Sequence, residues 1–123
     1  MSELRTDTIT ASDGTSPVTL TKQSAAKVWV NFNGIGTIAA RDSFGVSSLD
    51  DDGTGNYGVN FSSSFSNGDY SATSTTSGGG NLVIPYDDYT QTAGSYTIGI
   101  RRTDTSNFLD ASRIHYSMNG DLA

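Results

Sequence analysis

The sequence predicts an all-β protein: an antiparallel β-sandwich or a small barrel of about seven or eight short strands. Gly (14), Ser (18) and Thr (16) dominate its 123 residues. Apolar and polar residues alternate with period two, and turn signals recur about every 8–12 residues. The acidic residues are twelve Asp against one Glu, and there are only two Lys. Because Asp favours turns while Glu and Lys favour helices, this balance argues against a helical fold.

The clearest strand signal follows residue 26. Side chains there alternate between two faces, as they do along an extended strand. Three apolar side chains share one face and three others share the opposite face: Val28, Val30 and Phe32 against Lys27, Trp29 and Asn31. Asn33-Gly34 follows at once and is a pair that tight hairpin turns favour. The segment therefore predicts a strand with one apolar face, and Trp29 lies on the other face.

Seven more segments complete the predicted set of strands. In order they span residues 35–41, 44–49, 57–61, 70–76, 82–84, 96–100 and 114–118. Asp50–Asn56, Asn67-Gly68 and the three glycines at 78–80 mark turns or loops between them. Pro85 ends the apolar run at 82–84, so residues 85–89 are expected to form a loop.

Residues 1–27 are predicted to form an extended segment, separate from a β-domain at 28–123. Apart from Met1, the segment has only four large apolar side chains, too few to offset an ordering cost of roughly 1–2 kcal/mol per residue. Residues 23–27 are expected to form at most one or two helical turns. The segment is either a mobile tail or is ordered by packing on sister chains. The subunit-interface candidates are Leu4, Ile9, Val18, Leu20, Ala25 and Trp29.

Charge and composition exclude several classes of partner. The net charge is −6 and the sequence pI is about 4.3, so binding to nucleic acid or to an anionic membrane is not expected. No apolar run reaches the 18 residues of a membrane span, which excludes membrane insertion through a helix. A signal peptide is not expected either, because no basic stretch precedes an apolar one. The chain has no Cys, so no disulfide stabilises the fold.

The sequence gives no strong signal for catalysis, a metal or a cofactor. Residues 50–56 resemble the start of a calcium loop, but such a loop ends in a Glu ligand and the only Glu is Glu3. A solvated turn is the preferred interpretation. His115 is the only histidine and is expected on the surface, since a zinc site needs more than one such ligand. Glycan hydrolysis by a carboxylate pair needs a cleft that so small a chain seldom builds. We expect no enzymatic activity.

Two features favour recognition of another surface. Tyr86, Asp87, Asp88 and Tyr89 combine aromatic faces with carboxylates and are the receptor-contact candidates, with the triglycine loop beside them. Alternatively, the two Tyr rings anchor their loop onto the sheet. Trp29 lies opposite the apolar face of its strand, so it meets a partner or is covered on both sides; burial in a subunit interface is the preferred interpretation. The arginines at 101, 102 and 113 are expected to pair with nearby Asp residues.

Four runs of the sequence resemble short tail-fibre and receptor-binding proteins of bacteriophages, notably those of marine bacteria and cyanobacteria. The runs are LRTDTIT at 4–10, LTKQSAAKVWVNFNG at 20–34, RDSFGVSSL at 41–49 and DGTGNYGVNF at 52–61. The match covers about residues 2–70, and the later half follows the group in type only. The sequence departs from the commoner pattern at Gly45 and Gly58, where that pattern has a side chain.

The resemblance implies a homotrimeric virion protein without enzymatic activity, located at the tail fibre or tail tip. Its N-terminal segment would attach to tail baseplate or tip proteins, and its β-domain would meet a glycan or protein on the host surface. Two alternatives stay open. One is a purely structural baseplate, tail-assembly or capsid-decoration protein. The other is a carbohydrate-binding module.

Overall fold

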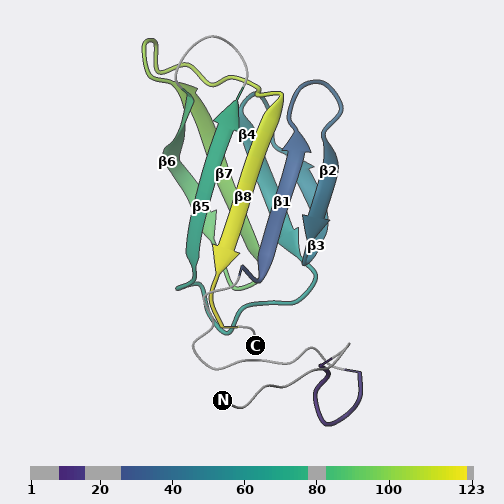
Figure 1. Cartoon of the computed structure of the whole chain (residues 1–123). Helices are drawn as coiled ribbons and strands as arrows, with labels where there is room; N and C mark the ends of the chain where they lie inside the picture. Colours follow the sequence, from purple (N-terminus) through teal and green to yellow (C-terminus); the bar gives the residue numbers. More distant parts are fainter. Residues whose placement is uncertain (1–8, 16–25, 78–82, 122–123) are drawn as a thin grey trace, which may run out of the picture.

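Eight antiparallel strands form two four-stranded sheets that pack face to face (Figure 1). The computed structural model of the chain describes residues 9–15, 26–77 and 83–121, and for residues 83–89 it describes the backbone. The strands are β1 (Val28–Asn33), β2 (Ala39–Phe44), β3 (Val46–Asp51), β4 (Asn56–Phe61), β5 (Ser71–Ser77), β6 (Val83–Gln91), β7 (Ser95–Arg102) and β8 (Arg113–Asn119). The described residues form no helix, and so include none that could cross a membrane.

The strand order distinguishes the two sheets. Sheet I has the order β2-β1-β8-β5, and sheet II has the order β3-β4-β7-β6. Sequential hairpins join β1 to β2, β3 to β4 and β6 to β7, whereas β8 returns to the middle of sheet I between β1 and β5. Both sheets keep open edges. The prediction of an all-β antiparallel sandwich with seven or eight strands is confirmed, and the alternative of a closed barrel is wrong.

The core lies between the sheets and is rich in aromatic side chains. Along β1 the alternation predicted from the sequence is confirmed, with Val28, Val30 and Phe32 buried. The Phe32 ring makes an edge contact with Tyr57 of β4, at 5.5 Å between ring centroids, and a tilted contact with Tyr116 of β8 at 5.8 Å. Such pairs add about 0.5–1.5 kcal/mol to the free energy of area burial. All the buried apolar residues of the described chain lie between Val28 and Met118.

The predicted strands at 35–41 and 44–49 are wrong in their boundaries. Residues 34–38 form the turn after β1, where the Asn33 side-chain amide donates to the Ile35 carbonyl at 2.7 Å, so β2 begins at Ala39. Gly45 then separates β2 in sheet I from β3 in sheet II, with φ at 70°. A Cβ there would lie 2.8 Å from the Lys27 carbonyl oxygen. This corner between the sheets accounts for glycine at position 45.

Gly58 has a different cause. It lies on the outer face of sheet II, where a Cβ would come within 3.2 Å of the Asp50 and Thr97 side chains. A residue with a side chain would crowd both neighbours. Glycine at this position leaves room for Asp50 and Thr97 in the adjoining strands.

The expected loop at 85–89 is also wrong, because these residues belong to β6. Pro85 has no N–H to donate, but β6 is an edge strand of sheet II, and edge strands tolerate proline. The expected helical turns at 23–27 lie mostly outside the described residues. Ala26 and Lys27, which are described, are not helical.

The free energy of unfolding is expected to fall at alkaline pH because three tyrosines are buried. Burial raises the pKa of Tyr57, Tyr70 and Tyr116 above the usual value of 10.0; a hydrogen bond to Asp110 adds to the effect at Tyr57. A raised pKa in the folded state favours the neutral phenol, so this stability is complete below pH 10 and declines above it. The expected loss is about 1.4 kcal/mol per pH unit for each such group. Circular dichroism and tyrosinate absorbance should show one cooperative alkaline transition.

Two Tyr→Phe variants separate the contributions. The Tyr116 hydroxyl is buried and has no hydrogen-bond partner among the described residues, so Tyr116→Phe is expected to stabilise the fold by about 1–3 kcal/mol and to move the transition to higher pH. The Tyr57 hydroxyl lies 2.8 Å from Asp110 Oδ1 and 2.9 Å from the Gly34 carbonyl. Tyr57→Phe should therefore destabilise the fold at neutral pH. Equal effects of the two variants would contradict this account.

Candidate functional site

An exposed aromatic pair lies on the outer face of sheet I. Trp29 of β1 is the direct cross-strand partner of Phe44 of β2, and their exposed fractions are 36% and 59%. Trp29 points outward because Val28 and Val30, on either side of it, point into the core. Among the described residues only two other large apolar side chains are exposed, Ile9 and Ile35. Two adjacent aromatic rings that are exposed on the outer face of a sheet do not contribute to the core, so they indicate contact with another molecule.

Polar side chains surround this pair on the same face. The strand registers place Ser117 of β8 beside Trp29, and Thr73 of β5 beside Ser117. The next row reads Asp42, Asn31, His115 and Thr75 across β2, β1, β8 and β5. A shallow groove of about 110 Å³ runs between β5 and β8, lined by residues 73–75 and 115–117. The outer face of sheet I thus combines aromatic rings with hydroxyl, amide and imidazole groups.

Two arginines bring positive charge to this face. Arg41 is the extra residue of a bulge in β2, since Asn31 pairs with Asp42 and Phe32 pairs with Ala40. Its guanidinium crosses β1, contacting Asn31 Oδ1 at 3.4 Å and donating to the Ser112 carbonyl at 2.7 Å. Arg113 follows and is exposed.

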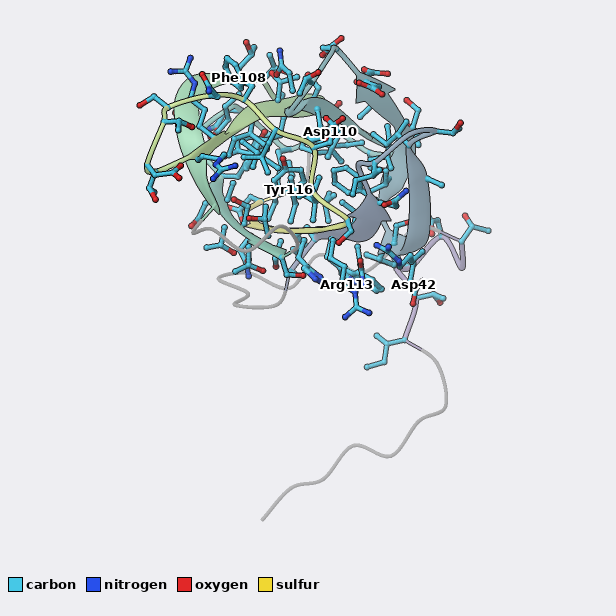
Figure 2. The ribbon with its side chains drawn as sticks, turned by 90° about the horizontal axis from the view of Figure 1, so that it is seen from above. Asp42, Phe108, Asp110, Arg113 and Tyr116 are labelled. Carbon is cyan, nitrogen blue, oxygen red and sulfur yellow. The ribbon has the colours of Figure 1, made fainter. Side chains whose placement is uncertain are left out.

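Figure 2 shows the Arg113 and Asp42 side chains projecting outward on the same side of the sandwich. The loop residues Phe108 and Asp110 lie away from them in the same view. Of the arginines expected to pair with Asp, Arg102 does so with Asp104, at 2.9 Å. Arg113 has no ion pair within the described part of the chain. Its charge is therefore directed to solvent.

His115 lies where the alternation predicts. Its neighbours Ile114 and Tyr116 are buried in the core, and His115 is half-buried on the outer face of sheet I. The acidic run at 50–52 also lies at the surface: Asp51 Oδ1 accepts the Gly53 N–H at 3.1 Å, and Asp50 Oδ2 accepts the Asn60 amide at 2.7 Å. Both carboxylates thus make local hydrogen bonds beside a tight turn.

The receptor-contact candidates do not join the aromatic pair. Tyr86, Asp87, Asp88 and Tyr89 lie on β6 of sheet II, whereas Trp29 and Phe44 lie on sheet I. The register of β6 against β7 shifts between Tyr86 and Thr90, so Asp87, Asp88 and Tyr89 form a bulge opposite Ile98. Bulges at sheet edges often re-aim side chains near functional sites. The triglycine at 78–80 lies outside the described residues.

The structure places only two of the subunit-interface candidates. Leu4, Val18, Leu20 and Ala25 lie outside the described residues. Ile9 is exposed next to a turn that the Gly14 N–H closes onto the Ala11 carbonyl at 2.9 Å. Trp29 is half-exposed beside Phe44. Its role in a subunit interface stays a prediction, and it competes with a role of the same side chain in contact with another molecule.

Sequence reasoning missed Phe44 and Arg41 as members of this surface. The sequence pattern places Phe44 at the start of a strand over 44–49, which separates it from Trp29. Counting back from a two-residue turn at Asn33-Gly34 would pair Trp29 with Ile38. The longer turn at 34–38 and the bulge at Arg41 together move its partner to Phe44.

Both members of the aromatic pair lie in runs of sequence quoted above. Trp29 lies in the run at 20–34, and Phe44 lies in the run at 41–49. No family model, curated protein or solved structure matches this chain. The resemblance to tail-fibre proteins that the sequence analysis describes stays a prediction.

Proposed function

We propose that this chain is a bacteriophage tail-fibre or tail-tip protein that attaches the virion to the host surface through weak, multivalent binding. The observation that carries the proposal is the exposed Trp29–Phe44 pair on an otherwise polar sheet face. Large aromatic side chains are the most frequent anchors of recognition surfaces. The two runs of sequence that hold these residues also carry the resemblance to tail fibres.

Residues 1–27 are assigned to assembly in this proposal. The buried apolar residues of the described chain begin at Val28, and Ile9 is 59% exposed. A sister chain or a tail protein would bury such side chains at about 25 cal/mol per Å² of apolar area. Three copies held together would also present three weak sites, which raises avidity through effective concentration without tight individual binding.

An adsorption experiment tests the proposal. Purified protein is expected to compete with the parent phage for host cells. A Trp29→Ala, Phe44→Ala double variant should need about tenfold or more protein for the same inhibition, because both aromatic contacts are lost. The number of unadsorbed phage after a fixed time is the measurement. Circular dichroism of the variant should match that of the parent chain, since both side chains are exposed.

Matched variants make the result specific. Ile35→Ala removes another exposed apolar side chain, 52% exposed, and should leave competition unchanged. A Tyr86→Ala, Tyr89→Ala double variant tests the bulge of β6. If this variant competes for adsorption as well as the parent chain does, the bulge is not a receptor contact. Light scattering on the same samples should give about three times the chain mass of 12.9 kDa. A folded monomer that does not compete would contradict the proposal.

The same experiment decides the structural alternative. A baseplate, tail-assembly or capsid-decoration protein would be part of the virion but would not inhibit adsorption at any concentration. An antibody against the chain would then label virions without blocking infection. That outcome would remove host attachment from the proposal and leave the virion assignment in place.

A further inference from the structure

We propose that the outer face of sheet I binds an acidic glycan. One sugar ring would stack on the Trp29–Phe44 pair, and the carboxylate of another unit of the same glycan would meet the guanidinium groups of Arg41 and Arg113. This inference rests on the proposed function, since it names the class of receptor. It assigns the surface to sugar chemistry and not to a protein partner.

The aromatic pair suits a sugar ring because its two rings are adjacent, exposed and flanked by polar groups. The less polar face of a pyranose can cover an aromatic ring, while its hydroxyl groups need hydrogen-bond partners at the ring edge. Ser117 and Thr73 supply hydroxyl groups in the same row as Trp29. Asn31 and His115 supply an amide and an imidazole in the next row. The two rows are about 7 Å apart along the strands, at roughly 3.4 Å per residue.

The charge of this face selects an acidic sugar. The whole chain carries −6, yet Arg41 and Arg113 stand on this face with Asp42 as their acidic neighbour. Among the described residues of this face the local charge balance is therefore positive, within a negative protein. Guanidinium groups bind carboxylates through paired hydrogen bonds. The surplus negative charge elsewhere would repel the same ligand, so an acidic glycan is directed to this face.

The spacing indicates an oligosaccharide. Ser117, the partner of Trp29, lies four residues from Arg113 along β8, which is roughly 13 Å. Arg113 follows Ser112, whose carbonyl accepts a hydrogen bond from Arg41. The groove between β5 and β8 continues the surface across the sheet. One sugar cannot contact the aromatic pair and Arg113 together. A chain of several units can do so.

The only Trp in the chain reports directly on this site. Titration of the full-length protein with tetragalacturonate should change the fluorescence of Trp29 and saturate, whereas neutral maltotetraose should bind at least about tenfold more weakly. Raising the NaCl concentration from 0.05 to 0.5 M (on the order of tenfold) should weaken binding of the acidic sugar, because salt screens exposed charges.

Matched variants assign the contacts. Arg113→Gln should weaken tetragalacturonate binding by about three- to fivefold. Arg102→Gln makes the same change in net charge at a residue paired with Asp104, and should have no effect. Phe44→Ala keeps the fluorescent probe and should weaken binding about tenfold, while Ile35→Ala should not.

Three outcomes would overturn this inference: no fluorescence change with tetragalacturonate, equal binding of the neutral sugar, or equal effects of the two arginine variants. A second copy of the chain on this face would make Trp29 fluorescence depend on protein concentration and not on sugar, and would also overturn it. Host attachment is tested separately. Competition for adsorption without sugar binding removes the glycan only, and sugar binding without competition removes the host-attachment proposal only.

Discussion

Gly55→Ala is expected to destabilise the fold by about 2–5 kcal/mol, a large part of the 5–15 kcal/mol typical of a domain. Gly55 precedes β4 with φ at 66°, a left-handed conformation that costs residues with a side chain about 1–2 kcal/mol. An added Cβ would also lie 2.7 Å from the carbonyl oxygens of Ile100 and Leu109. These are backbone atoms, so they cannot move aside as a flexible side chain can. Urea unfolding followed by circular dichroism measures the loss.

Gly36→Ala is the matched control for this prediction. Gly36 has nearly the same φ, 69°, but no atom of the residues that the structure describes lies within 4 Å of its added Cβ. The control should therefore lose only the conformational term, about 1–2 kcal/mol. The difference between the two variants isolates the close approach of β4 to the loop at Leu109. Equal losses would show that this approach does not constrain position 55.

Phe32→Ala should lower the midpoint of thermal unfolding by about 10–20 °C, corresponding to a loss of about 3–5 kcal/mol. The Phe32 side chain is 0% exposed and contacts rings from both sheets, Tyr57 in sheet II and Tyr116 in sheet I. Truncation leaves a cavity between the sheets and removes both ring contacts. Differential scanning calorimetry measures the change.

Phe44→Ala makes the same chemical change in the neighbouring strand. Because Phe44 is mostly exposed, its loss should cost less than about 1 kcal/mol. Comparable losses at 32 and 44 would contradict the assignment of Phe32 to the core and of Phe44 to the outer surface. The same comparison shows whether Phe44→Ala can be used as a binding variant without loss of folding.

The fold class followed from local patterns because the sandwich obeys the period of two in most of its strands. The alternation at 28–32, 57–61, 96–100 and 114–118 gave the inward faces of β1, β4, β7 and β8 correctly. These strands provide most of the core. Local patterns suffice where one face of a strand is buried and the other is polar.

The misplaced elements depend on contacts that are distant in sequence. Gly45 has its conformation because β2 and β3 enter different sheets, and no local signal shows which sheet a strand joins. Pro85 usually ends a strand, yet it is tolerated in β6 because that strand lies at an edge. The position of β8 between β1 and β5 is likewise a product of packing. Boundaries and topology therefore needed the structure.

The candidate surface was only partly foreseeable. The alternation placed Trp29 outward, and its exposure agrees. The partnership with Phe44 depends on the register of the β1–β2 hairpin, and the reach of Arg41 to Ser112 depends on a bulge. Neither a register nor a bulge is marked by residue type alone. The composition of residues 86–89, two Tyr and two Asp, predicted a receptor contact, but these residues lie on the other sheet.

The entry and exit of the chain lie at one pole of the sandwich. The Lys27 N–H donates to the Met118 carbonyl at 2.8 Å, so the polypeptide enters β1 beside the place where it leaves β8 (Figure 1). Trp29, the second residue of β1, sits on the flank close to that pole. Residues preceding β1 would tether the domain at this pole. To bring the outer face of sheet I into contact with a flat surface, the domain would lie on its side, and the opposite pole would make no contact with that surface.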